Sequence, residues 1–99
     1  MADRIEIRHP GIILLEEFLQ PLGISQNKLA RAMHVPSGRI NEIVKGKRSI
    51  SAETSLLLGK ALGMSERFWL NLQVDYDFRM ARRAYEDKGN LEISPLRAA

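Results

Sequence analysis

The 99-residue sequence predicts an all-α fold of five helices, the last of which is long. Apolar residues recur every three or four positions in five stretches, which is typical of helices that bury one face. Ser, Pro and Gly residues flank these stretches at positions where helices begin and end. Ile5 with Ile7, and Leu91 with Ile93, alternate instead like short strands, a weak signal over so few residues.

The first predicted helix begins at Pro10, where a missing N–H costs nothing, and ends at Pro21 and Gly23. Its apolar residues are Leu14, Leu15, Phe18, Leu19 and Leu22. Ser25 is the expected N-cap of a second, short helix. The residues that this helix is expected to bury are Leu29, Ala30 and Met33.

A tight turn at His34 and Val35 precedes the third predicted helix, which begins at Pro36 and ends at Gly46. Its inward residues are Ile40, Ile43 and Val44. A polar loop, residues 47–49, comes next, and Ser51 is the expected cap of a fourth helix that ends at Gly63. The apolar residues of the fourth helix are Leu57, Leu58, Ala61 and Leu62.

The fifth predicted helix is capped by Ser65 and runs from about Glu66 to Asp87. Met64 and Trp69 have the spacing of a hydrophobic staple across its start. The helix carries two apolar stripes on nearly opposite sides. The first stripe is Phe68, Trp69, Leu72, Tyr76 and Met80, and the second stripe is Leu70, Val74, Phe78, Ala81 and Tyr85.

One stripe can pack on the protein's own helices, and the other needs a second surface because apolar patches of this size are rarely left in water. We expect a second copy of the chain to cover it, which makes the protein a homodimer. The second stripe is the predicted interface, although the sequence leaves open which stripe pairs. The alternative is that residues 89–99 cover part of one stripe.

The length indicates a single domain over residues 9–88, with an N-terminal arm at 1–8 and a C-terminal tail at 89–99. The sequence contains no cysteine, which excludes a disulfide framework and a thiolate metal site. No apolar run is long enough for a membrane span, and the first residues do not resemble a signal peptide. We therefore expect a cytoplasmic protein with no membrane partner.

The net charge of +3 is concentrated in one segment. Residues 26–48 hold six basic residues and one acidic residue, a net charge of +5, so the rest of the chain is at −2. A local basic block is typical of a surface that binds a polyanion, although a solvated basic face without a partner has the same composition.

The same segment has the layout of a helix-turn-helix unit, residues 25–46, in which two helices of under ten residues are joined by about three. Ala30 is small where the helices would cross, and Val35, Ile40 and Ile43 would hold the second helix on the first. Small or hydrogen-bonding side chains remain outward on the second helix, as a helix in the major groove of DNA requires. An ordinary helical hairpin has similar spacing, but the coincident charge favours DNA binding.

Two sets of residues carry a resemblance to a known family. The core pattern resembles the Cro/CI (XRE) family of helix-turn-helix regulators: Gln26-x-x-Leu29-Ala30, Val35 and Ile40-x-x-Ile43-x-x-Gly46-Lys47. Flanking motifs resemble the HigA (VapI-like) branch of that family: His9-Pro10-Gly11, Leu14 to Leu19, Gly46-Lys47-Arg48 and Phe68-Trp69-Leu70-Asn71-Leu72-Gln73. The resemblance covers about residues 9–85.

This resemblance implies a five-helix, lambda-repressor-like domain with a long C-terminal helix. It also implies a sequence-specific DNA-binding regulator, an antitoxin that represses its own operon and binds a small basic toxin resembling RelE-type ribonucleases. The alternative is a stand-alone regulator of the XRE family with no toxin. Glu16 and Glu17 could contact a basic toxin, but exposed acids on a helix are usually only solvated.

The sequence departs from the family pattern at two positions. His34 stands where the turn commonly has Gly, and we expect it to adopt a positive φ with mild strain. Ile12 stands where the branch often has Glu.

Family docking would place the second helix of the unit in the major groove, N-terminus first. The predicted base-facing residues are Ser37, Gly38, Arg39, Asn41 and Glu42. Arg39 can bridge guanine O6 and N7, and Glu42 can accept from cytosine N4. Asn41 could pair with adenine or turn toward the partner helix instead. The predicted phosphate contacts are Gln26, Asn27, Lys45, Lys47 and Arg48.

No residues suggest an enzyme, a cofactor or a metal site. The two histidines, His9 and His34, are expected at a helix start and in a turn. Asp75 and Asp77 point about 200° apart on a helix, so they do not share a site. The sequence has no glycine-rich phosphate loop and no cluster of metal ligands.

Overall fold

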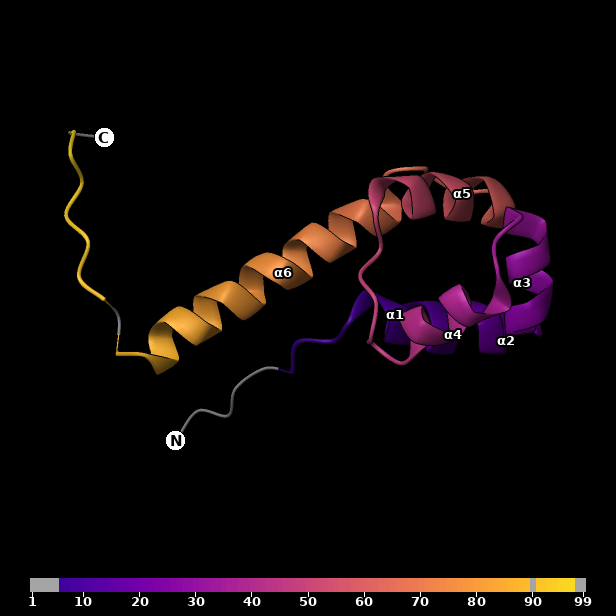
Figure 1. Cartoon of the computed structure of the whole chain (residues 1–99), viewed down its shortest axis with the longest axis horizontal. Coiled ribbons are helices and arrows are strands. Elements are labelled where there is room, and N and C mark those ends of the chain that lie inside the picture. The colour runs from indigo at the N-terminus through magenta and orange to yellow at the C-terminus, as the bar shows by residue number, and fades with distance from the viewer. Residues whose placement is uncertain (1–5, 90, 98–99) are drawn as a thin grey trace.

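The computed structural model describes residues 6–89 and 91–97, and over these residues the chain is all-helical (Figure 1). The helices are α1 (Pro10–Ile13), a π-helical segment (Leu14–Leu19), α2 (Gln20–Leu22), α3 (Gln26–Met33), α4 (Ser37–Val44), α5 (Ala52–Leu62) and α6 (Phe68–Asp87). The first three run on without a break and form one helix, which confirms the predicted five-helix, all-α fold. None of the described helices is long and apolar enough to cross a membrane.

The strand-like alternation near the two ends of the chain forms no strand within the described residues. Ile7 lies in the coil before α1, and Leu91 and Ile93 lie in an exposed extended tail. Ile5 falls outside the described residues. An isolated strand needs a neighbour for its backbone hydrogen bonds, and the helices near these stretches already use theirs internally.

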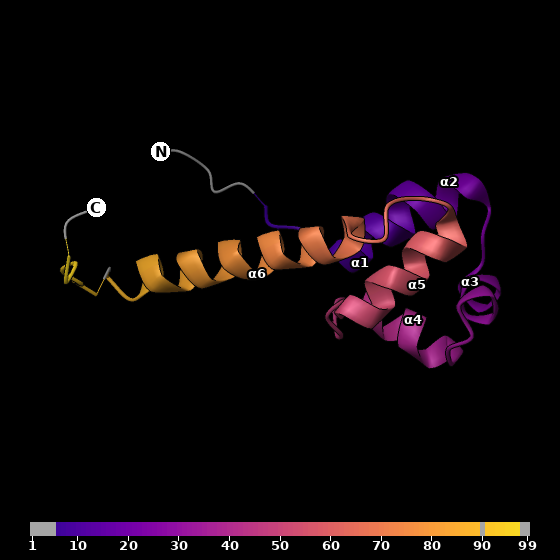
Figure 2. The ribbon, with the colours of Figure 1, turned by 90° about the horizontal axis from the view of Figure 1, so that it is seen from above.

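The helices up to α5 pack into one body, which the first turns of α6 join beside α1 and α5, and the rest of α6 projects away from this body (Figure 2). The radius of gyration is 16.7 Å, whereas a compact chain of this length has about 13 Å. The difference reflects the projecting half of α6. The chain therefore consists of a packed body and a rod-like extension.

The core of the body is built where the helices cross. Its largest fully buried side chains include Trp69 of α6 and aliphatic residues from four other segments: Leu14, Leu19, Ile40, Ile43, Ile50 and Leu58. Phe18 meets both Phe68 and Trp69 edge-on, with ring centroids 6.2 and 5.0 Å apart. This aromatic cluster fastens the start of α6 to the first helix.

The first helix widens into a π-helical register before Pro21. The N–H of Gln20 donates to the carbonyl of Leu15, five residues back. In a regular α-helix the ring of Pro21 would clash with the carbonyl of Glu17, and the wider register accommodates it. The extra residue per turn also rotates the last turn of the helix, so Leu22 is 61% exposed and the prediction that it joins the buried face is wrong. Gly23, at φ 66°, ends the helix as predicted, while Pro21 lies inside it.

Two predicted caps are confirmed and one is wrong. The hydroxyl of Ser25 accepts from Lys28 N–H, and that of Ser51 accepts from Thr54 N–H. The start of α6 lies two residues later than predicted, at Phe68. Ser65 closes only a turn there, because its hydroxyl accepts from Arg67 N–H at 3.3 Å.

The later start of α6 has two consequences. Trp69 now stands too close to the helix start to form the predicted staple with Met64, which packs against the core instead. Helix α6 starts later because the chain just before it crosses α5 closely. A Cβ on Gly59 would lie 2.6 Å from Glu66 Cα. The hydroxyl of Ser55 donates to Glu66 O and accepts from Leu70 N–H, which fixes this crossing.

The N-terminal end of α1 lies almost in backbone contact with the end of α4. A Cβ on Gly11 would lie 1.7 Å from the carbonyl oxygen of Ile43. Only glycine permits this approach. The contact fixes how α4 sits on the first helix.

His9 caps the same helix end. Its Nδ1 accepts from Gly11 N–H at 2.9 Å, which requires a neutral imidazole with its proton on Nε2. Its ring meets Tyr76 of α6 edge-on, with centroids 5.0 Å apart. Burial lowers the pKa of His9 below its usual 6.5, and the nearby Asp77 carboxylate opposes this only in part.

We expect Gly11→Ala to lower the free energy of unfolding by about 3 kcal/mol or more, because the new methyl group overlaps a backbone atom. Chemical denaturation followed by the fluorescence of Trp69, the single tryptophan, measures it. Gly38→Ala is the matched control, because no atom lies within 4 Å of its added Cβ. It should leave stability unchanged or raise it by up to about 1 kcal/mol. Equal effects of the two substitutions would contradict the close approach.

We expect the protein to lose stability as the pH falls below 6.5, the ordinary pKa of histidine. In that range the unfolded chain takes up a proton on His9 while the folded chain does not, so protonation favours unfolding. The loss stops once the pH is below the folded-state pKa. Unfolding free energies measured from about pH 7.5 to about pH 5.5 test this, with His9→Asn as the non-titrating control. Identical pH dependence in both proteins would contradict the assignment.

Candidate nucleic-acid interface

Helices α3 and α4 form the predicted helix-turn-helix unit, each eight residues long and joined by residues 34–36. His34 adopts φ 59° and ψ 41°, the left-handed conformation expected at this turn. The turn is closed by Val35 N–H, which donates to Ala30 O at 3.0 Å. Ala30 is buried at the base of the turn, so the two short helices pack closely.

Helix α4 presents one apolar face and one polar face. Ile40 and Ile43 are fully buried and Val44 nearly so, as predicted. The residues predicted to face bases lie on the other side: Ser37, Gly38 and Glu42 are exposed, and Arg39 and Asn41 are half-buried. The structure therefore gathers all five on one accessible surface of α4.

Arg39 is free among these residues. Its guanidinium makes no hydrogen bond or ion pair with any other described residue. It stands in the first turn of α4, where its backbone N–H donates to Pro36 O. A planar guanidinium without an internal partner can meet a flat hydrogen-bonding edge.

Asn41 is held by the neighbouring helix. Its amide nitrogen donates to Gln26 Oε1 at 3.2 Å, across the α3–α4 crossing. The second of the two sequence alternatives, in which Asn41 turns toward the partner helix, is the one that the structure shows. The bond joins a predicted base reader to a predicted phosphate contact, so the two side chains position one another.

Glu42 and Arg48 also form a pair, with Arg48 Nε 2.8 Å from Glu42 Oε1. Both side chains are half-exposed, so the pair contributes little to stability. Arg48 shares its charge with Glu42, whereas Lys45 and Lys47 are exposed and have no ion pair with a described residue. These two lysines are therefore the positive charges after α4 that remain available to a negatively charged partner.

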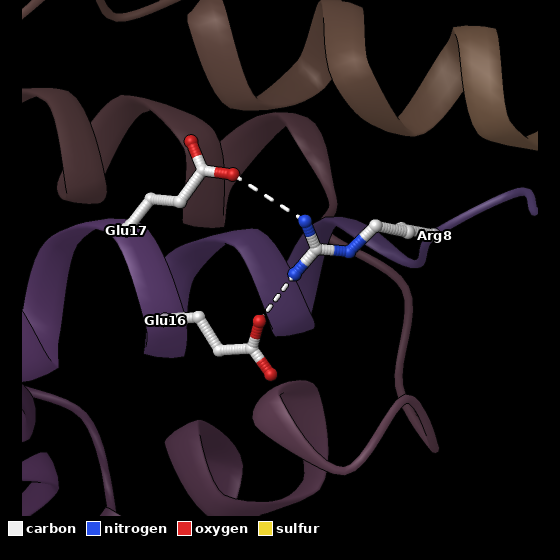
Figure 3. A network of polar contacts seen from close by, with 3 residues as sticks. All are labelled: Arg8, Glu16 and Glu17. Atoms are coloured by element: carbon white, nitrogen blue, oxygen red, sulfur yellow. Dashed lines mark hydrogen bonds and ion pairs between the residues drawn. The ribbon is translucent and has the colours of Figure 1, made fainter.

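The acidic pair on the first helix is not free. Arg8 reaches Glu16 at 2.5 Å and Glu17 at 3.4 Å, as Figure 3 shows. A basic partner that docks on Glu16 and Glu17 would have to displace this arginine.

In the described part of the chain, no group of three or more His, Asp or Glu residues could hold a metal ion.

Sequence reasoning missed Gln73, a buried glutamine on α6. Its Oε1 accepts from the backbone N–H of Ile50 at 2.8 Å, and its Nε2 donates to Asp77 Oδ1 at 3.0 Å. Gln73 thereby fastens α6 to the end of the loop that carries Lys47 and Arg48. A polar residue at the end of an apolar helical run was the available signal.

The two stripes of α6 differ in exposure. In the first stripe, Trp69 is fully buried, Phe68 and Leu72 pack on the core, and Tyr76 meets His9. This stripe therefore packs on the protein's own helices, except at Met80, which is 40% exposed. The second stripe is exposed except at Leu70, which is half-buried.

Val74 and Phe78 are the centre of this exposed face, at 58% and 60% exposed. The guanidinium of Arg82 lies 5.1 Å from the centre of the Phe78 ring, a cation–π contact. The tail contacts this face at Tyr85, which donates to Leu91 O. The described tail therefore reaches one end of the stripe, as the alternative had it, while Val74 and Phe78 stay exposed.

Known proteins resemble this chain over most of its length. A helix-turn-helix family model matches residues 15–69. Virulence-associated protein I of Dichelobacter nodosus is 47% identical over 86% of this chain and 76% of its own length. Antitoxin HigA-1 of Vibrio cholerae is 34% identical over 87% of this chain and 80% of its own length.

A solved structure agrees with these relatives. Antitoxin HigA of Pseudomonas aeruginosa, determined with the higBA promoter, is 41% identical. It covers 92% of this chain and 99% of its own, with a TM-score of 0.84. Family model, relatives and fold agree, so the chain belongs to the HigA-like branch of the helix-turn-helix family.

Proposed function

We propose that this protein is a sequence-specific DNA-binding repressor of its own operon and an antitoxin that binds a small basic toxin. The observation that carries DNA binding is the polar face of α4, with a free Arg39 at one end and the free Lys45 and Lys47 beyond the other. The relative solved with promoter DNA supports it. In a bacterium, where these relatives occur, such a role is carried out in the cytoplasm.

The polar face suits the major groove. With the N-terminus of α4 entering first, Arg39 would bridge guanine O6 and N7. Ser37 and Gly38 are small and exposed, so they allow the helix backbone to approach the bases. Glu42 would accept from cytosine N4 and release Arg48 to a phosphate. Asn41 would act together with Gln26, either reading adenine or keeping Gln26 in place.

Phosphate contacts would flank the recognition helix. Gln26 and Asn27 stand at the N-terminus of α3, where backbone N–H groups and a partial positive charge favour an anion. Lys45, Lys47 and Arg48 lie beyond α4 on the other side. Contacts of this kind set register and affinity rather than sequence preference.

The exposed stripe of α6 would join two copies. Leu70, Val74, Phe78, Ala81 and Tyr85 form this proposed interface. A two-fold pair would place the two α4 helices about 34 Å apart, so the operator would be palindromic with half-sites one turn apart.

The toxin partner is proposed from the relatives, two of which are named as antitoxins. No catalytic role is part of the proposal. Purification of the native complex separates an antitoxin from a stand-alone regulator, because only the antitoxin carries a second, basic chain of stoichiometric amount.

The base-reading role predicts that Arg39→Ala lowers affinity for the operator by about 1–3 kcal/mol and relaxes the preference at one base pair. Binding is measured on an operator selected from random DNA and on an unrelated duplex. Arg31→Ala, an exposed arginine on α3, is the matched control and should change both affinities little. An equal loss on both duplexes would show that Arg39 contacts only phosphate.

The pairing role predicts a solution mass of about twice 11.2 kDa for the wild type. Phe78→Glu should shift the equilibrium to monomer, because it places a charge in the centre of the apolar face. Sedimentation at micromolar concentration measures the mass. Leu96→Glu, which alters an exposed apolar residue of the tail, should leave the dimer intact. A monomeric wild type would defeat this interface.

A further inference from the structure

The 45–49 loop, which comes directly after α4, is fastened at its two ends and, between them, by the exposed Arg48–Glu42 ion pair. Its five residues are all exposed, so it buries no side chain of its own. At its start, Gly46 N–H donates to Ile43 O and Lys47 N–H donates to Glu42 O, both at 2.9 Å. At its other end, the buried Ile50 returns the chain to the core. The position of the loop therefore depends on how these ends are fastened.

Gln73 fastens the second end. Its side chain is 3% exposed, and its Oε1 accepts from Ile50 N–H at 2.8 Å. The amide is oriented by its other half, because Nε2 donates to Asp77 Oδ1 one turn further along α6. A glutamine uses both of its functions here, as acceptor for the loop and as donor to its own helix.

The first end lies near His9, whose ring contacts α6. A Cβ on Gly46 would lie 3.7 Å from the His9 ring, which in turn meets Tyr76 edge-on. Gln73 and Tyr76 are three residues apart and lie on one face of α6. Helix α6 thus fastens the second end of the loop and contacts the His9 ring that lies near the first end.

We infer that Gln73 is a positioning residue for DNA binding, which acts through the Ile50 N–H to hold the 45–49 loop where Lys45 and Lys47 reach phosphates. The inference rests on the proposed function. Val74 and Phe78, the centre of the proposed dimer face, lie on another side of the same helix. The helix proposed to pair the two copies therefore also positions the loop with which each copy binds the DNA phosphates.

The test compares Gln73→Met with the wild type. Methionine fills similar space without an acceptor, so the Ile50 amide loses its partner and the loop is released. Hydrogen exchange of the Ile50 amide, measured without DNA, should accelerate. The slope of log affinity against log salt should become shallower by up to about 4 per dimer, for the two lysine–phosphate contacts of each copy. Affinity for the operator and for random DNA should fall by the same factor.

Two further variants separate positioning from general stability. Ser55→Ala removes another buried hydrogen-bonding group between α5 and the start of α6, and it does not touch the loop. It should lower the melting temperature yet leave the salt slope unchanged. Gln73→Glu combined with Asp77→Asn exchanges donor and acceptor, restores both hydrogen bonds and should restore the slope. If Gln73→Met does not fold, Gln73→Asn replaces it, because its amide is one methylene too short.

The outcomes are distinct. A wild type that binds with a steep salt slope, beside a Gln73→Met variant of unchanged slope, overturns the inference alone. An equal change of slope in Ser55→Ala does so as well. A wild type with a flat salt response or no sequence preference overturns the proposed function, and the inference with it.

Discussion

The first turns of α6 are the part of the molecule on which the rest depends. Trp69 is fully buried there and contacts the aromatic residues that hold the first helix. Within two further turns, Gln73 fastens the 45–49 loop, and Tyr76 supports the His9 cap of α1. A single helix thus anchors the core, the loop and the start of the first helix. A shift of this helix relative to the body would therefore move the core contacts, the loop and the start of the first helix.

The two sides of α6 differ in what covers them. One side is buried in the body, and the opposite side leaves Val74 and Phe78 in water. A monomer gains nothing from such a face, and the projecting half of the helix makes the chain longer than a compact domain. Pairing through this face would use surface that the fold itself leaves unused, and it would join the two recognition helices in a fixed relation.

Local patterns predicted the helices well, because helix signals are short in range. Ser25 and Ser51 cap as expected, and His34 takes the left-handed conformation that the turn requires. Predictions failed where a distant contact intervened. The start of α6 moved because α5 crosses it at Gly59, and Leu22 turned outward because Pro21 imposes a wider register. Neither effect is visible in the spacing of apolar residues.

The sequence by itself determined the class of fold, the helix-turn-helix unit and the concentration of positive charge in residues 26–48, since each depends on neighbours along the chain. The tertiary structure decided which polar groups are free. Arg39 is unpaired with described residues, while Asn41 is held by Gln26 and Glu42 by Arg48. It also showed that Gln73 reaches Ile50, 23 residues away. Side chains so far apart in sequence meet only when the helices pack, and no local pattern encodes that meeting.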